Sequence, residues 1–338
     1  MRRQLSDRLF GLKRIGKYLT DSELRQAYSE FKESENTAFR LILNAILSEG
    51  WLVPLSQPLL AAELGRELGY TNLGLLKELL SLLVSRGVVN EENGLYSINQ
   101  VKTEPIRPED VGTLMTNFYY DCASFLPDAL RGKTVPLARV PRVVLESVFS
   151  SKLTEIGRGV LLRSFSSKKT REVGVAAFAD VGLPFAIRQV NELLSPDTIH
   201  VFISDFRWLP SFASVLRLLS EEDFTDKVQP HLYGLDVDAN LDLFYGEEFF
   251  AWMPDRLDEN IERISAMVKP GSRVITNDPT YIQEEPHSSA AYILMKTIDG
   301  YPQPLERTKL SNVFEQHSLR VQTIGDNWVI AEKEVSVK

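Results

Sequence analysis

Cysteine and histidine are scarce in this chain of 338 residues, and their scarcity excludes several kinds of site. Cys122 is the only cysteine, so the chain cannot form an internal disulfide bond or a zinc site made of four thiolates. The four histidines are scattered through the sequence, and no group of carboxylates has the spacing of metal ligands. We therefore expect no metal site and a reducing, cytoplasmic location.

The chain also lacks long hydrophobic runs and an excess of positive charge. Its longest apolar stretches, such as Leu75–Val84 and Val173–Ala179, are far shorter than the roughly 20 residues of a membrane-spanning helix. The N-terminal segment has no apolar region of the kind found in secretory signals. The net charge is −8, and residues 1–100 carry 12 basic and 12 acidic side chains. Neither a membrane nor a nucleic acid is therefore an expected partner.

What is present is an ordinary globular composition, with 43% hydrophobic and 25% charged residues. Within residues 51–99, two helices are predicted at Leu59–Leu68 and Leu73–Ser85, and Gly69 and Gly87 follow them. A β-hairpin is predicted over residues 88–98, around a Glu-Glu-Asn-Gly turn. Two helices followed by a hairpin indicate a winged helix. We expect a helical and winged-helix domain at 1–100, a helical connector at 101–170 and a third region at 171–338.

The third region alternates between apolar strands and amphipathic helices. Strands are predicted at residues 173–181, 200–203, 229–233, 241–244, 272–276, 319–323 and 328–332. Helices are predicted at residues 186–194, 212–219, 257–268 and 308–316. Continuous apolar strands separated by helices are typical of a mostly parallel sheet with both faces covered. The last two strands, joined by a tight turn, must be antiparallel. The fold class is therefore α/β with a Rossmann-like, seven-stranded sheet.

Three segments carry a family resemblance that extends over residues 38–333. They are residues 60–98, the segment Val268–Ile275 with Asp278 after it, and Glu306-Arg307-Thr308 before a helix. In this order they resemble the class I small-molecule O-methyltransferases that have an N-terminal winged-helix dimerisation domain. The resemblance implies S-adenosylmethionine as the methyl donor, a homodimer formed by the N-terminal domain, and a flat, apolar or aromatic metabolite as substrate, as in secondary metabolism.

The first strand of such methyltransferases ends in a glycine-rich turn that lets the backbone approach the donor. This chain keeps the beginning of that turn, Asp180-Val181-Gly182, but has Leu183, Pro184 and Ala186 where the family has glycines. We interpret the large side chains of Leu183 and Phe185 as occupying the space of the donor's methionine moiety. Whether the donor binds is therefore left open by the sequence. By resemblance the residues at the donor are Asp180, Gly182, Asp205, Phe206, Asp236 and Asp238.

The family's general base is a histidine after the fourth strand, and this chain has Phe250 at that position. Phenylalanine cannot accept a proton, so another residue is needed. Candidates are Glu247 and Glu248 at the end of the fourth strand and His287 in the loop after the fifth. Asp278 and Glu306 match the acids that orient the family's histidine, and structural hydrogen bonding or a helix start is the alternative role for them.

A set of aromatic residues with one methionine forms either a substrate pocket or part of the core: Tyr119, Tyr120, Phe249, Phe250, Trp252, Tyr292 and Met295. A cavity with such a lining would take a flat, apolar ligand. Three functions remain open. The chain is an active methyltransferase, or it is a diverged relative that catalyses another reaction or serves as a noncatalytic subunit. The third alternative is a winged-helix regulator that senses a ligand.

Overall fold

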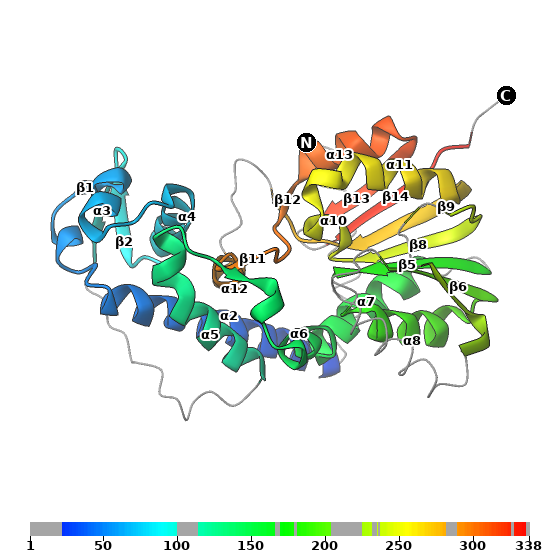
Figure 1. The fold of residues 1–338 in the computed structure, drawn as a ribbon, viewed down its shortest axis with the longest axis horizontal. Helices are drawn as coiled ribbons and strands as arrows, with labels where there is room; N and C mark the ends of the chain where they lie inside the picture. Colours follow the sequence, from blue (N-terminus) through cyan, green and yellow to red (C-terminus); the bar gives the residue numbers. More distant parts are fainter. Residues whose placement is uncertain are drawn as a thin grey trace. The chain divides into compact units, whose positions relative to one another are not determined.

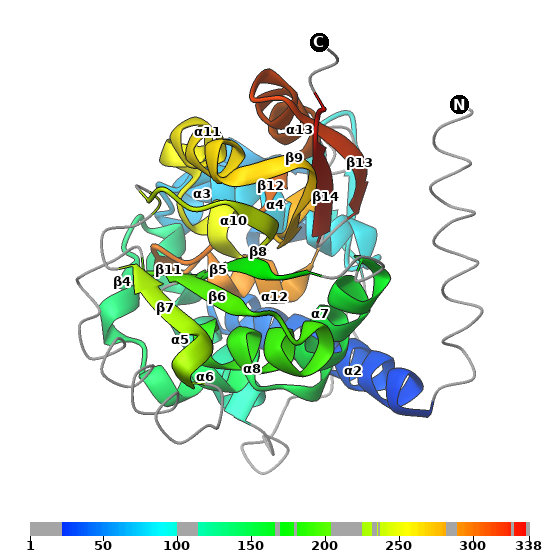
Figure 2. The same cartoon turned by 90° about the vertical axis from the view of Figure 1, so that its right-hand side faces the viewer.

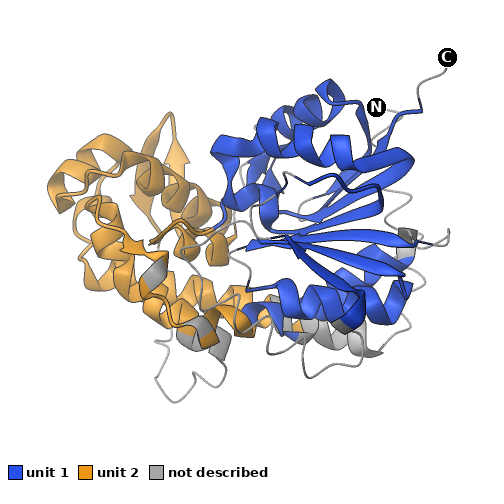
Figure 3. Ribbon diagram, turned by 45° about the vertical axis from the view of Figure 1, so that its right-hand side comes forward, with its two compact units in different colours: residues 1–28, 148–285, 302–338 blue, residues 29–147, 286–301 orange. Residues whose placement is uncertain are grey.

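The computed structural model describes residues 22–99, 114–165, 170–178, 181–203, 225–231, 235, 237–281, 289–325 and 328–335. The chain divides into two compact units (Figure 3). Unit 1 contains residues 1–28, 148–285 and 302–338, and unit 2 contains residues 29–147 and 286–301. No helix in the described part of the chain is long and apolar enough to cross a membrane.

A seven-stranded sheet is the centre of unit 1 (Figure 1). Its order is β13-β14-β9-β8-β5-β6-β7; β14 runs antiparallel to its neighbours β13 and β9, and the other neighbouring pairs are parallel. The strands are β5 (Glu172–Ala177), β6 (Thr198–Phe202), β7 (Val228–His231), β8 (Leu241–Glu247), β9 (Val268–Asn277), β13 (Leu319–Gly325) and β14 (Trp328–Lys333). The predicted α/β fold, with a mostly parallel sheet and a final antiparallel hairpin, is confirmed.

Helices cover both faces of this sheet, as Figures 1 and 2 show. On one face, α7 (Lys152–Phe165) and α8 (Leu183–Leu194) pack on Val173, Val175 and Ala177 of β5. On the other face lie α10 (Phe249–Trp252), α11 (Leu257–Met267) and α13 (Arg307–Gln316). Successive residues of a strand point to opposite faces, so the continuous apolar run of β5 supplies both cores.

The turn after β5 differs from its sequence prediction. The strand ends at Ala177 rather than 181, and α8 begins at Leu183 with Pro184 in its first turn, where proline is well tolerated. Leu183 is fully buried in the core between α8 and the sheet. Because its side chain packs in that core, the interpretation that Leu183 fills the methionine space was wrong. The predicted helix at 212–219 lies outside the described residues.

The start of β9 also differs from expectation. Residues 269–271, between the predicted helix and the predicted strand, lie inside β9, where the register against β8 shifts between Leu241 and Leu243. Gly271 has a φ of +77°, a left-handed conformation that glycine adopts without strain. The strand therefore begins at Val268, four residues before the predicted start. The described part of unit 1 also contains four short elements, which are the strands β10 (Thr280–Tyr281) and β12 (Leu305–Glu306) and the 3₁₀ turns η6 (Thr225–Lys227) and η7 (Pro254–Arg256).

Unit 2 is mainly helical and takes a segment from the C-terminal part of the chain. The helix–helix–hairpin order expected for residues 59–98 is present, although Leu59 and Leu60 form a short strand before the first helix. The Asn72 side chain accepts a hydrogen bond from the N–H of Leu75 at 3.1 Å and so caps the second helix. Its elements are α2 (Ser22–Ser48, in this unit from residue 29), η1 (Pro54–Ser56), β1 (Leu59–Leu60), α3 (Ala61–Leu68), α4 (Leu73–Ser85), β2 (Val89–Glu92), β3 (Leu95–Ile98), α5 (Leu114–Leu130), β4 (Val135–Pro136), η3 (Leu137–Arg139), α6 (Arg142–Phe149, in this unit to residue 147), α12 (Ala290–Met295) and β11 (Ile298–Asp299).

Candidate functional site

Polar residues gather at the carboxyl edge of the parallel strands in unit 1. Glu247 is the last residue of β8 and Glu248 follows it, Asp278 follows β9, and Gly182 precedes α8 in the connection after β5. In open α/β sheets, ligands bind outside the carboxyl ends of the strands, because several chain turns meet there. The carboxyl edge of unit 1 is therefore the candidate site.

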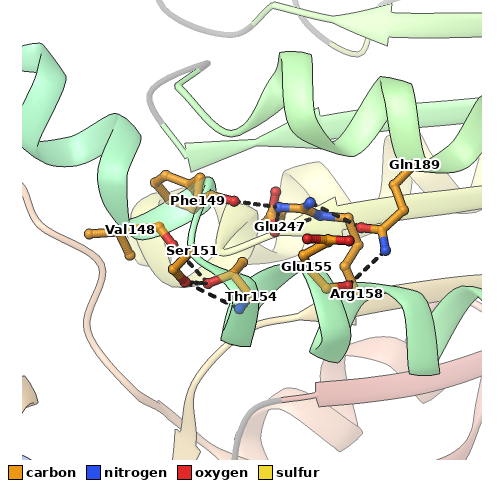
Figure 4. A network of polar contacts seen from close by, with 8 residues as sticks. All are labelled: Val148, Phe149, Ser151, Thr154, Glu155, Arg158, Gln189 and Glu247. Carbon is orange, nitrogen blue, oxygen red and sulfur yellow. Dashed lines mark hydrogen bonds and ion pairs between the residues drawn. The ribbon is translucent and has the colours of Figure 1, made fainter. Parts of the chain in front are cut away.

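A buried ion pair connects α7 to β8 at this edge (Figure 4). Arg158 Nη2 and Nε donate to Glu247 Oε1 at 2.6 and 3.0 Å, and the two side chains are 2% and 0% exposed. Arg158 Nη1 donates to Gln189 Oε1 at 3.1 Å, and Nη2 also donates to the Phe149 carbonyl at 3.3 Å. A buried charge needs such partners because it is costly to remove from water. The guanidinium therefore joins α6, α7, α8 and β8.

Sequence reasoning missed Arg158. One local signal was available: in α7 the arginine is three and four residues before Leu161 and Leu162, so it shares their helix face. Both leucines are buried, and a single charge on an apolar face indicates a buried partner. The neighbouring sequence does not identify that partner, because Glu247 is 89 residues away in the chain.

Gly182 lies directly against this ion pair. A Cβ added there would be 2.8 Å from Glu247 Oε2, 3.1 Å from Phe149 Cδ1 and 3.3 Å from Ala177 Cβ. The backbone φ of −74° is ordinary, so close approach and not conformation requires the glycine. The close approach at Gly182 is therefore made by the protein's own carboxylate.

We expect Gly182→Ala to destabilise unit 1 by about 1–3 kcal/mol, because the new methyl group overpacks the contact with Glu247 and Phe149. Gly157→Ala is the matched control. Gly157 lies inside α7 with no atom within 4 Å of an added Cβ, so alanine there should stabilise the helix by about 0.5–1 kcal/mol. Urea unfolding of both variants measures the difference. Equal stability of the two variants would contradict the packing at Gly182.

Glu248 has three unusual properties at once. It adopts a left-handed backbone with φ of +50°, which is strained for a residue with a side chain. Part of the residue reaches solvent, yet its Oε2 is shielded from water and has no hydrogen-bond partner. Burial, followed by the charges of Glu247 and Asp278, raises the pKa of Glu248 to about 8. Strain, an unsatisfied carboxyl oxygen and a near-neutral pKa together are typical of functional sites.

Glu247 and Asp278 are also buried, but each has hydrogen-bond donors. Burial raises the pKa of Glu247, and the Arg158 guanidinium opposes the rise. Asp278 accepts hydrogen bonds from the Thr276 hydroxyl and from the backbone N–H of Ala251, the latter at 2.7 Å. Burial raises the pKa of Asp278 to about 7 against these hydrogen bonds. Asp278 therefore connects the end of β9 to α10, which is the structural role left open for it.

Glu306 caps a helix at the surface. Its carboxylate accepts hydrogen bonds from the N–H groups of Thr308 and Lys309 at 2.8 and 2.6 Å, at the start of α13. Slight burial acts to raise the pKa of Glu306, but these N–H donors hold it below its ordinary value. The alternative role predicted for it, a helix start, is confirmed.

The predicted pocket residues fall into two groups. In unit 1, Phe249 and Phe250 are buried in the core, where Phe250 stacks edge-on against Phe249 and Phe314 at 5.4 and 5.6 Å. The core alternative is therefore correct for both, whereas Trp252 is half-buried and stacks edge-on against Phe178 at 5.6 Å. The others belong to unit 2, with Tyr119 and Met295 buried, Tyr292 half-buried and Tyr120 49% exposed.

The remaining predicted donor residues are only partly within the described structure. Asp238 is exposed after β7, while Asp180, Asp205, Phe206, Asp236 and His287 lie outside the described residues. Among the residues that are described, no group of three or more histidine, cysteine, aspartate and glutamate side chains is arranged to hold a metal ion.

Comparison with known proteins supports the fold. No family model matches the chain, and no curated protein matches it in sequence. The structure resembles the CurJ carbon methyltransferase, with a TM-score of 0.63 and 14% identity over 98% of both chains. It also resembles the DszA carbon methyltransferase, with a TM-score of 0.63 and 13% identity over 93% of both chains. An O-methyltransferase family 2 protein from Planctomyces limnophilus DSM 3776, in complex with apigenin, has a TM-score of 0.53 and 15% identity, over 89% of this chain and 93% of that one. The chain therefore has the class I methyltransferase fold.

Proposed function

We propose that the protein transfers a methyl group from S-adenosylmethionine to a small molecule, with Glu248 as the proton acceptor. The observation that carries the proposal is the Glu248 carboxyl: its Oε2 is buried without a partner, and its backbone is strained at the carboxyl end of β8. A general base works best when its pKa lies near the operating pH, and the pKa of Glu248 is raised to about 8. This carboxylate replaces the histidine of the resembled family.

The described residues fit the methyl donor at one point. Glu247 Oε2, which lies beside Gly182, is a buried carboxylate oxygen without a hydrogen-bond partner. Such an oxygen suits the positive charge and the N–H donors of S-adenosylmethionine. When bound, this donor supplies an electrophilic methyl group. Within this proposal Arg158 holds Glu247 through Oε1, which leaves Oε2 for the donor.

We propose a flat, apolar or aromatic substrate. In support, Trp252 offers a half-buried aromatic ring beside Phe178, at the end of the short helix that follows Glu248. The similar Planctomyces protein was solved with apigenin, and the CurJ and DszA proteins are described as carbon methyltransferases. Methylation of an oxygen or of an acidic carbon requires removal of a proton, so Glu248 serves either acceptor.

We also propose a homodimer formed by the N-terminal part of the chain. In support, unit 2 exposes several large apolar side chains between residues 52 and 95. Leu52 is 47% exposed and Val53 79%, and Leu60 and Leu95 pair across β1 and β3 with exposures of 46% and 37%. Apolar surface of this kind is favourable to cover with a second copy.

A relative without methyl-transfer activity is the second candidate. One observation favours it: Phe250, at the position of the family's histidine, is fully buried in the core and contacts Phe249 and Phe314. In that case the carboxyl edge binds a ligand for another reaction or for no reaction.

Titration calorimetry with S-adenosylmethionine separates these candidates. We expect micromolar binding to the full chain, because the ligand brings a positive charge to the Glu247 oxygen. Glu192→Gln, a change on the exposed side of α8, is the control and should bind as the wild type does. Absence of binding heat at millimolar ligand would contradict methyl transfer and leave the second candidate.

A further inference from the structure

The charges around Glu248 are unequally distributed. The carboxyl groups of Glu247 and Asp278 both act on Glu248 at the carboxyl edge, and Arg158 is the cation paired with Glu247. The Tyr245 phenol is also buried among them and interacts with Glu247, Arg158 and Asp278. Like charges in a low dielectric cannot all persist, so some of these carboxyls carry protons.

The hydrogen bonds indicate where the negative charge resides. Glu247 Oε1 accepts two N–H groups from Arg158, and Asp278 accepts a hydroxyl and a backbone N–H. Glu248 Oε2 accepts none. Hydrogen bonds and opposite charges stabilise the ionised form of a carboxyl group. Glu247 is therefore the favoured anion, and its charge repels ionisation of its neighbour Glu248.

The two carboxylate oxygens of Glu247 have different surroundings. Oε1 is taken by Arg158, whereas Oε2 is buried against Gly182 without a partner. A cation that reaches Oε2 makes the net charge around Glu247 positive, because Arg158 already neutralises the carboxylate through its other oxygen. The added positive charge then stabilises a second anion in the same cluster, and Glu248 is the carboxyl without donors of its own.

We infer that Glu247 couples the binding of a cationic ligand to the ionisation of Glu248, with Arg158 as the residue that keeps Glu247 anionic and positioned. On arrival of the cation at Glu247 Oε2, Glu248 releases its proton to solvent water. The carboxylate formed is then available to take a proton from the substrate. The inference rests on the proposed function, since S-adenosylmethionine is the cation, and it explains how the base is activated only in the presence of the donor.

Proton release is the direct test. Calorimetry of the full chain near pH 7, repeated in buffers of different ionisation enthalpy, counts the protons released on binding S-adenosylmethionine. We expect between about half a proton and one proton, with affinity rising roughly three- to tenfold between about pH 6.5 and 7.5, because proton release and binding are linked. In wild-type protein, 5′-methylthioadenosine, which lacks both the sulfonium and the ammonium, should bind without proton release.

Variants identify which carboxyl group releases the proton when S-adenosylmethionine binds. Glu248→Gln should bind S-adenosylmethionine without releasing a proton, and Glu247→Gln should bind it more weakly and also without release. The surface control Glu192→Gln should retain release, and Asp278→Asn should release less because the charge of Asp278 helps to raise the pKa of Glu248. Release that persists in Glu248→Gln or disappears in Glu192→Gln would overturn the inference, as would equal release with 5′-methylthioadenosine. The comparison of S-adenosylmethionine with 5′-methylthioadenosine uses wild-type protein, so it remains valid if a variant fails to fold. Failure of S-adenosylmethionine to bind at all would instead overturn the proposed function.

Discussion

Replacing Glu248 with glutamine should lower methyl transfer by about 10²–10⁴-fold, the usual contribution of a general base. Glutamine keeps the size of the side chain but cannot accept a proton. The assay measures transfer from labelled S-adenosylmethionine to a panel of flat phenols that includes apigenin. Because the glutamine side chain retains most contacts of the glutamate it replaces, stability should change little in comparison with activity, and urea unfolding verifies this.

The pH dependence gives a second measurement of the same group. Only the ionised carboxylate accepts a proton, so wild-type kcat/KM for S-adenosylmethionine should rise with pH and level off above about 8, following the pKa of Glu248 in the free protein. Glu192→Gln, on the exposed side of α8, should keep both the rate and the profile. A Glu248→Gln variant with wild-type turnover would show that the base is another residue.

Breaking the buried ion pair should have the largest effect on stability. Arg158→Met leaves Glu247 buried without its counter-charge, and the loss of one partner of such a pair costs about 3–5 kcal/mol. Glu247 avoids part of this cost by taking a proton. Its folded-state pKa is then raised further above the unfolded value, so the variant should lose stability as the pH rises above the ordinary glutamate pKa of about 4.3.

The double variant Arg158→Met with Glu247→Leu distinguishes charge from packing. With both charges replaced by apolar groups of similar volume, most of the lost stability should return. Arg171→Gln is the control, because its pair with Asp197 is 63% and 62% exposed at 3.9 Å and contributes less than about 1 kcal/mol. Urea unfolding at several pH values measures all three variants. If the free energy of unfolding of Arg158→Met lies within about 1 kcal/mol of the wild-type value, the pair is not buried and interdependent as described.

Local patterns in the sequence determined most of the fold. The apolar runs and their spacing predicted five of the seven sheet strands to within three residues of their observed ends, because strand and helix periodicity are properties of neighbouring residues. The exceptions are β5, which ends four residues before its predicted end, and β9, which begins four residues early with a register shift against β8. Glu247 and Glu248 were found in the same way, since residues that end a buried parallel strand meet at the carboxyl edge.

Only the tertiary structure decided which of these residues act together. The sequence did not show that Arg158 pairs with Glu247 or that Glu306 caps a helix rather than completing the site. It also misplaced Leu183, whose side chain turns into the core because α8 begins three residues earlier than its pattern predicted. Burial, pairing and side-chain direction depend on distant segments that meet in space, whereas hydrophobic periodicity is complete within a single element.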